Sequence, residues 1–483
     1  MSIVGLYKTK DCLYPKCFRP GKKYPEYRFG ELSDTENNVY EAVRECFHIM
    51  GLDDGNYNTV KWNPLKDYVK PGNTVLIKPN LVMDVNFNKE GGTDCLYTNP
   101  SVVAPVIDYV LIALEGKGKI VVGDAPMQEC NFDNLVETSG YSRLVDYYRT
   151  KGIDIELVDF RELTSVVSHG VYVSSLNKYA KGKVVNLGRE SEFYGCDDEQ
   201  INRIRITNYD PRILPTHHKG ELQEYYVSQY VLDADVIINM PKPKSHRKAG
   251  MTSALKNFVG ANVRKEYLPH HTQGSVEEGG DEYLNKNWLR KQQSRLLDIR
   301  NVQRAEKKYH RSILAQYIIR ILGIISKLTG QQYTEGSWYG NHTISRTICD
   351  LNKIVFYASK DGSMGDTKQR EILIIADMII SGEKEGPVNP TPKDVGIIAM
   401  GNNPVLFDEI IATIMGFDVN KIPMFDAVKG YCGKYRYYEK NDVPEVVSNI
   451  EAFNDMITKG FSFEQSLKYE PTSGWKGHIE LEN

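Results

Sequence analysis

Residues 238–263 read INMPKPKSHRKAGMTSALKNFVGANV, and this stretch predicts a buried strand together with a candidate binding site. An apolar strand pattern stops at Pro241 and Pro243, because proline cannot donate a backbone hydrogen bond to a neighbouring strand. A cationic loop with a histidine follows, and a short helix is expected to start near Met251 and Thr252. Cations beside a helix N-terminus suit an anionic ligand. A solvated basic loop would have the same composition, so both interpretations remain open.

Short apolar runs of the same kind recur along the chain, and each ends abruptly in Gly, Pro or polar residues. Continuous β-branched runs suit strands that are buried on both faces, as in a parallel sheet covered by helices. The runs cover residues 75–80, 119–126, 155–160, 235–246, 371–380 and 395–404.

Helices are expected between these strands. Asn99 and Pro100 have the residue types that favour the cap and the first position of a helix, and Gly116 marks its end. Further helices are predicted at 133–150 and after Asn403 and Pro404. The predicted fold class is therefore α/β, with a mostly parallel, doubly wound sheet, helices on both faces and inserted segments.

The 483 residues are divided into a core and additions. Residues 1–73 are expected to pack on the core as an N-terminal segment, residues 74–428 to form the α/β core, and residues 429–483 to form a C-terminal extension. Two segments interrupt the core: a polar, Tyr- and Asn-rich insertion at about 161–230 and a helical, basic insertion at about 286–342.

Composition excludes several classes of protein. The 60 Lys and Arg against 63 Asp and Glu give a net charge of −3, so a nucleic-acid partner is not expected. The 8 cysteines contain no CxxC pair, so no iron–sulfur cluster is expected, and reduced thiols favour a cytoplasmic location. No signal peptide is expected, because the apolar stretch at the start of the sequence is very short, and the sequence contains no run of about 18 apolar residues.

The basic insertion is a second candidate binding surface, separate from the strand ends. Residues 286–330 hold eleven Lys or Arg against Asp298 and Glu306, and their second half, SILAQYIIRILGIISKL, is strongly apolar. A basic amphipathic helix can lie on an anionic membrane, which would make the protein membrane-peripheral. The same helix can instead pack on the sheet or on a second subunit in a homodimer.

Polar residues at the ends of the predicted strands form the candidate site, since ligands of doubly wound sheets bind beyond the carboxyl ends of the strands. Lys256, inside the apolar frame SALKNFVG, is predicted to be catalytic with His246 and His270, because a lysine facing a cavity can titrate near neutral pH and histidine can move protons. The residues predicted to bind substrate are Lys78, Asn80, Lys242, Lys244 and Asn257.

Three aspartates are candidate ligands for a divalent metal: Asp124, Asp377 and Asp408. Strand-end aspartates are also common helix caps, so the metal is an alternative and the cofactor stays open. The loop around His270 can equally be a plain surface loop. The chain has no GxGxxG, Walker A or GxSxG motif, so no dinucleotide, nucleoside triphosphate or serine-hydrolase site is predicted.

At these residues the sequence resembles the family called domain of unknown function 362. The resemblance rests, in order, on VLIKPNLV, VGDAP, DADVIINMPKPKSH, MTSALKNFVGANV, ADMIISGEKEGP and MGNNPVLFDEIIATIMGFD, across roughly residues 74–428. Some members carry ferredoxin-like cysteine clusters, and this chain departs from them in having none. The LKNFVG segment and the following histidine loop also look like the lysine and histidine arrangement of the nickel-pincer lactate racemase family.

Two classes of function follow. The first is an enzyme that binds a small anionic metabolite, which is phosphorylated, linked to a nucleotide as in a nucleotide sugar, or a carboxylate. By analogy with the racemase family, such an enzyme would be a racemase or isomerase. The second is a non-catalytic binding or scaffold protein that docks through its basic helix.

Overall fold

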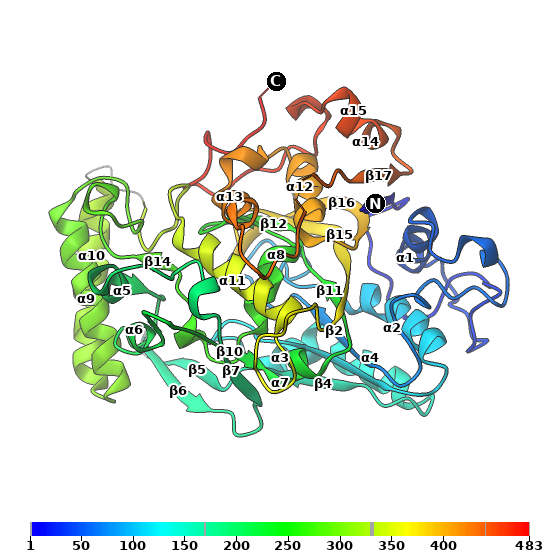
Figure 1. Ribbon diagram of the computed structural model, residues 1–483, viewed down its shortest axis with the longest axis horizontal. Helices are drawn as coiled ribbons and strands as arrows, with labels where there is room; N and C mark the ends of the chain where they lie inside the picture. Colours follow the sequence, from blue (N-terminus) through cyan, green and yellow to red (C-terminus); the bar gives the residue numbers. More distant parts are fainter. Residues whose placement is uncertain (1, 169–170, 329–332, 440, 483) are drawn as a thin grey trace.

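A central sheet of ten strands organises the molecule, which is a computed structural model that describes residues 2–168, 171–328, 333–439 and 441–482 (Figure 1). Its strands run in the order β17-β1-β16-β15-β11-β2-β3-β4, with β12 and β13 attached beside β15. The predicted runs form β2 (Thr74–Pro79), β3 (Lys119–Asp124), β4 (Glu156–Asp159), β11 (Val236–Met240), β15 (Glu371–Glu385) and β16 (Asn389–Gly401). The five strands from β15 to β4 are mutually parallel, which confirms the predicted fold class.

The other side of the sheet consists of β16, from the predicted core, and two strands from outside that core. β16 returns antiparallel to β15, and β1 (Ile3–Lys8) pairs antiparallel with β16. β17 (Glu445–Ser448) then adds to β1 in parallel. The N-terminal segment and the C-terminal extension therefore each contribute a strand to the same sheet.

Helices cover both faces of the sheet, and the side chains of the strands alternate between two cores. On β2, Val75 and Ile77 belong to one core and Leu76 to the other. The first core contains residues of α1 (Asn38–Ile49), α2 (Pro100–Leu114), α3 (Phe132–Ser139) and α4 (Tyr141–Arg149). The second contains residues of α7 (Gln229–Asp233), α8 (Ala254–Asn257), α11 (Thr343–Tyr357), α12 (Pro404–Met415) and α13 (Pro423–Gly430).

The helix ends follow the expected sequence signals. The Asn99 side chain accepts a hydrogen bond from Ser101 N at 3.0 Å, with Pro100 in the first turn of α2. Asn403 caps α12 in the same way. The helix expected at 133–150 is divided into α3 and α4 at Gly140, whose φ of 91° lies in the left-handed region that glycine adopts readily.

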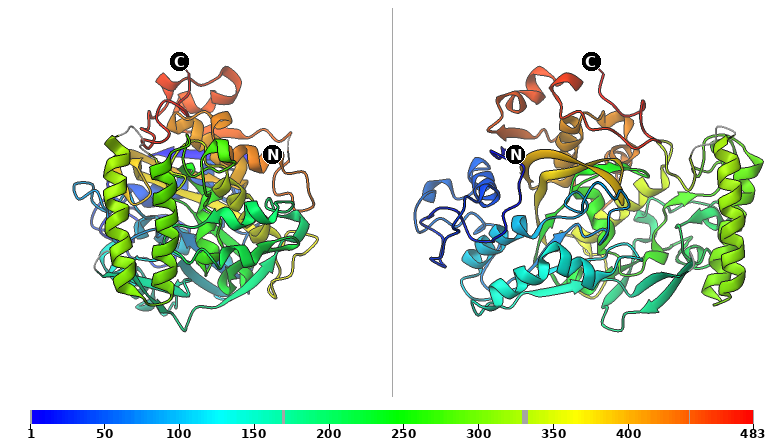
Figure 2. Two further views of the ribbon diagram at one scale, coloured as in Figure 1. Left: turned by 90° about the vertical axis from the view of Figure 1, so that its left-hand side faces the viewer. Right: turned by 180° about the vertical axis from the view of Figure 1, so that it is seen from behind.

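The two insertions form separate layers beside the sheet. The first contains the antiparallel hairpin of β5 (Leu163–Ser168) and β6 (Val171–Leu176) and a small sheet of β7 (Gly182–Asn186), β9 (His218–Lys219) and β10 (Leu222–Ser228). The second contains α9 (Trp288–Ala305) and α10 (Tyr309–Leu328), which stand side by side at one edge of the molecule (Figure 2). Residues 329–330 of the predicted basic segment lie outside the described residues.

The remaining elements are short. They are β8 (Ile204–Arg205), β12 (Lys244–His246), β13 (Gly250–Thr252), β14 (His271–Thr272), α5 (Asp198–Arg203), α6 (Leu214–His217), α14 (Glu451–Asn454), α15 (Met456–Lys459) and seven single-turn helices, of which η3 (Phe258–Ala261) directly follows α8. In the described part of the chain, no helix combines the length and the hydropathy that crossing a membrane requires.

We predict that the N-terminal strand is needed for stability. Leu6 on β1 is fully buried, so Leu6→Ala should lower the free energy of unfolding by about 2–5 kcal/mol. Leu13→Ala is the matched control, because Leu13 is 70% exposed and its truncation should change stability little. Urea unfolding followed by circular dichroism measures both. Equal effects of the two substitutions would contradict the placement of β1 inside the sheet.

Candidate functional site

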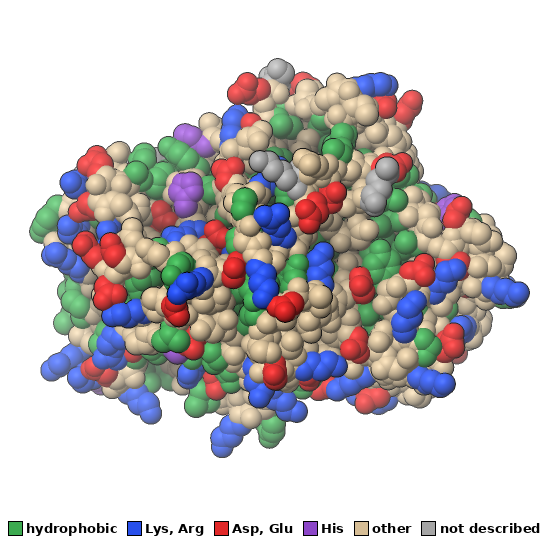
Figure 3. Space-filling view, viewed as in Figure 1, with side chains coloured by type: hydrophobic (Ala, Val, Ile, Leu, Met, Phe, Trp, Pro, Cys, Tyr) green, Lys and Arg blue, Asp and Glu red, His purple; other side chains and the backbone are tan. Residues whose placement is uncertain are grey.

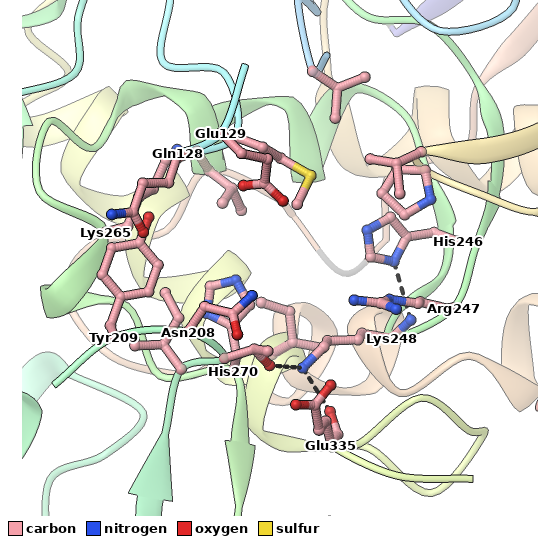
Figure 4. Close-up of a pocket in the computed structure, with 18 of the residues that line it drawn as sticks. Gln128, Glu129, Asn208, Tyr209, His246, Arg247, Lys248, Lys265, His270 and Glu335 are labelled. Carbon is pink, nitrogen blue, oxygen red and sulfur yellow. Dashed lines mark hydrogen bonds between the residues drawn. The ribbon is translucent and has the colours of Figure 1, made fainter. Parts of the chain in front are cut away.

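A cavity of about 1010 Å³ lies beyond the carboxyl ends of β2, β3 and β11. The core lines it with Asn80, Asp124, Lys244, His246, Lys256, Asn257 and His270, among others. The first insertion adds Tyr172, Asn208 and Tyr209, the α9–α10 hairpin adds Arg300, Gln316 and Arg320, and the tip of the β15–β16 hairpin adds Glu385 and Asn389. Figure 4 shows ten labelled side chains of this lining arranged around an open centre.

The floor of the cavity is fixed by an ion pair between neighbouring strands. Lys78 near the end of β2 donates to Asp124 Oδ1 at 2.7 Å, and both side chains are buried. Asp124 Oδ2 accepts a hydrogen bond from Leu81 N at 2.8 Å. Gly260 packs so closely on this pair that a Cβ there would lie 1.9 Å from Asp124 Oδ1. Lys78 therefore holds Asp124 in place and does not itself line the cavity.

An amide network joins the strand ends to α8. Asn257 donates to Asn239 Oδ1 at 2.7 Å and to the Lys78 carbonyl at 3.2 Å. Its own side-chain oxygen accepts from Asn80 at 3.3 Å, and Asn80 in turn accepts from Lys244 Nζ at 3.1 Å. These bonds satisfy buried polar groups and fix the angle at which α8 leaves the sheet.

Asp408 anchors the start of α8. This fully buried carboxylate on α12 accepts hydrogen bonds from Ala254 N and Leu255 N, both at 2.8 Å. Acceptors at a helix N-terminus satisfy backbone N–H groups that have no partner within the helix. Burial raises the pKa of Asp408 to about 7. Asp408 thus positions the helix that carries Lys256 and lies away from the cavity.

Lys256 presents its ammonium group to the cavity without a protein partner. Among the described residues, no group forms a hydrogen bond or ion pair with Lys256 Nζ, although the side chain lines the cavity. Burial lowers its pKa to about 8, an effect that the nearby Asp124 opposes and Lys78 reinforces. An ammonium group in this setting is a strong binding site for an anion, because ligand charge replaces the water that the cation has lost.

Further cations surround Lys256, and their partners are mostly uncharged. Lys265 donates to the Ala125 carbonyl at 2.9 Å and Lys248 to Thr207 Oγ1 at 3.1 Å, while Lys244 binds Asn80. Burial lowers the pKa of Lys244 and of Lys265 to about 7 and that of Lys248 to about 8. In all, seven Lys or Arg side chains line the cavity against four Asp or Glu. The cavity is therefore electropositive.

The two histidines predicted to be catalytic carry their ring protons on different nitrogen atoms. His246 Nδ1 lies 3.1 Å from Lys248 N and 3.2 Å from Ala249 N, which can only donate, so Nδ1 accepts and the ring proton sits on Nε2. His270 Nδ1 lies 2.8 Å from the Leu268 carbonyl, which can only accept, so Nδ1 carries the proton and Nε2 is bare. Burial and neighbouring cations lower the pKa of both rings well below 6.5, which keeps them neutral.

Several predicted residues lie elsewhere. Lys242 donates to Asp377 Oδ2 at 3.0 Å, and Asp377 also accepts from Tyr14 Oη at 2.7 Å, so the pair is a buried ion pair that is not part of the cavity lining. Asp124, Asp377 and Asp408 consequently occupy three separate places. No cluster of three or more His, Cys, Asp or Glu with the geometry of a metal site occurs in the described ranges.

Sequence reasoning missed part of the lining. Arg247 and Lys248 belong to the quoted KPKSHRK segment, and Lys265 follows a few residues after LKNFVG. The sequence therefore shows that these segments are basic, but it does not show that these three side chains face the cavity. Asn208, Tyr209 and Arg300 come from the insertions, where no strand end marks them. For residues of this second kind, the sequence contains no signal that could have identified them.

Comparisons with known proteins agree with the resemblance read from the sequence. A family model described as "Domain of unknown function (DUF362)" matches residues 75–185 and 193–413. The chain is also 29% identical over 194 residues to a protein of Synechocystis named "Thylakoid-associated protein sll1697". That alignment spans 40% of this chain and 40% of the relative, so it concerns less than half of either protein.

We predict that nuclear magnetic resonance will find the two opposite tautomers. In protein labelled with ¹⁵N histidine, long-range ¹H–¹⁵N spectra near neutral pH should show His246 protonated at Nε2 and His270 protonated at Nδ1. The reason is that His246 Nδ1 faces two backbone N–H donors, whereas His270 Nδ1 faces a carbonyl acceptor. His246→Gln and His270→Gln assign the signals of the two rings. Identical tautomers for the two rings would refute this arrangement.

Proposed function

Since the chain belongs to the domain of unknown function 362 family, whose description names no reaction, we propose a function from the cavity itself. The protein is an enzyme that binds an anionic metabolite, carrying a carboxylate or a phosphate, and transfers a proton on it. The observation that carries the proposal is the Lys256 ammonium group, which lines the cavity without a hydrogen-bond or ion-pair partner among the described residues.

The anion is held in this proposal by cations whose charge the protein leaves uncompensated. Lys256 binds an acidic oxygen directly, and Arg247, whose guanidinium also lines the cavity, supplies a second contact. Lysines with a pKa near 7 or 8 lose part of their charge in the empty cavity, and a bound anion restores it. Binding of substrate is thereby linked to proton uptake.

His270 performs the proton transfer and His246 assists it. His270 Nε2 has a free lone pair and acts as the base, and the neutral His246 ring donates its Nε2–H in a hydrogen bond to the substrate oxygen on which negative charge develops. Each ring is locked in its tautomer by backbone groups, so neither needs a carboxylate to orient it. A base that can return the proton it has taken, beside a hydrogen-bond donor for the developing charge, is what an isomerase requires, and this supports the isomerase- or racemase-like alternative within the same proposal.

The cavity volume of about 1010 Å³ leaves room for more than a single acidic group. Tyr209, Asn208 and Gln128 line it with groups that bind hydroxyls. A phosphorylated or nucleotide-linked sugar fits this lining, and it is the finer substrate class we propose.

We also propose that the protein works in contact with a membrane surface from the cytoplasmic side. Support comes from the relative of Synechocystis, whose name describes association with the thylakoid. The basic composition of the α9–α10 hairpin agrees with such a location.

We predict that sulfate binds in the cavity and that its affinity falls as pH rises. Sulfate keeps its charge between about pH 7 and about pH 9, whereas Lys256 loses its proton through a pKa of about 8, so affinity should decrease over this range. Lys256→Met should weaken binding about 10- to 100-fold near pH 7 and make the pH dependence shallower. Isothermal titration calorimetry measures both. Lys61→Met, at an exposed lysine, is the control, and a wild-type affinity in Lys256→Met would refute the assignment.

We further predict solvent exchange catalysed by His270. A metabolite extract incubated with the protein in D₂O should yield one anionic metabolite that gains deuterium, detected by untargeted mass spectrometry, because a base that removes a carbon-bound proton exchanges it with solvent. His270→Gln should abolish the exchange and keep sulfate binding, while Lys256→Met should lose both. Labelling that persists in His270→Gln, or no enzyme-dependent labelling at all, would contradict the proton-transfer step.

A further inference from the structure

The outward side of α10 carries an apolar stripe that nothing in the described chain covers. Its members are spaced three and four residues apart, which places them on one side of a helix. They are Leu314, Tyr317, Ile318, Ile321, Ile324, Ile325 and Leu328, with exposures from 39% for Ile318 to 83% for Leu328. Leaving this many large apolar side chains in water on one helix is unusual for a surface without a partner.

The opposite side of α10 packs against the rest of the molecule and contributes to the cavity lining. Ser312, Ala315 and Ile319 are buried against the rest of the molecule, and Gln316 and Ile319 line the cavity. None of the seven residues of the stripe lines the cavity. The helix therefore has two faces with separate roles, and the stripe can be changed without altering the site.

The charge around the stripe identifies its partner. α10 contains no acidic residue, and exposed Arg311 lies on one side of the stripe while exposed Lys327 lies on the other. The two acidic residues of α9 and the turn are engaged, since Asp298 accepts from Arg205 and Glu306 from Arg212. Hydrophobic and basic side chains lie together along this edge of the molecule, on the left of Figure 3.

We infer that the stripe of α10 docks on an anionic lipid bilayer. Apolar side chains flanked by Lys and Arg match the acyl boundary and the acidic headgroups of such a surface. Trp288 at the start of α9 is 70% exposed, whereas the other three tryptophans are buried, and tryptophan favours the interface of a membrane. A second copy of the chain fits less well, because a two-fold contact would bring the same basic residues face to face. The inference rests on the proposed membrane contact and names the surface that makes it.

The test is co-sedimentation of the full chain with vesicles of phosphatidylcholine, with and without phosphatidylglycerol. Wild-type protein should bind the anionic vesicles, and high salt should weaken the binding. Ile321→Glu with Ile324→Glu should reduce binding at least about tenfold, because it places two carboxylates in the stripe. Arg311→Ala with Lys327→Ala should reduce binding to anionic vesicles and flatten the salt dependence.

The matched control is Leu13→Glu with Val60→Glu, which places the same charges on exposed apolar residues elsewhere and should leave binding unchanged. Sulfate affinity, measured in parallel, should be that of wild type in the stripe variant and reports that the cavity is intact. If wild-type protein binds but the stripe variant binds equally well, the stripe is the wrong surface while the membrane contact stands. If wild-type protein binds no vesicles, both fail, and a change of oligomeric state in the stripe variant would then assign the stripe to a second copy.

Discussion

The buried ion pair between Lys78 and Asp124 is the constraint from which the site is built. It ties the ends of β2 and β3 together at 2.7 Å, and Gly260 rests on it where no other residue would fit. Ala125 N donates to the Gly260 carbonyl at 3.0 Å, which attaches η3 to the end of β3. Since η3 continues α8, the direction of Lys256 depends on this contact. Removal of either charge would leave the other buried without a partner, which typically costs about 3–5 kcal/mol.

Above this rigid floor, the cavity contains lysine side chains whose positive charge is only partly balanced by nearby carboxylates. Lys244, Lys248, Lys256 and Lys265 are lysines whose burial disfavours their charge. Such an arrangement lowers the stability of the empty protein, and functional sites are where proteins tolerate that cost. Asp408 and the asparagine network oppose it, because they satisfy the backbone and hold α8 in place.

The parallel half of the sheet could be predicted because strands buried on both faces leave continuous apolar runs in the sequence. β1 and β17 could not, since IVGLYK and EVVS are short and their partners are far away in the chain. Lys242 and Lys244 lie on either side of Pro243, yet Lys242 binds Asp377 and Lys244 binds Asn80. The direction in which a side chain points is decided by contacts with distant residues, whereas the residue types can be read from the sequence. The part of the cavity lining that the insertions supply could not be predicted for the same reason.

The position of β1 also has a consequence for how the protein folds. Gly5 is paired with Met400 on one side and with Val447 on the other, so β1 finds its partner strands only after residues far later in the chain have been made. Contacts of such large sequence separation slow folding, because the ends of a long segment must be brought together, at a cost in chain entropy, before the stabilising hydrogen bonds between them can form. Once β16 has been made and until β1 pairs with it, the free edge of β16 can pair with other chains. The demand on chaperones should therefore be greatest in the interval before β1 and β16 have paired.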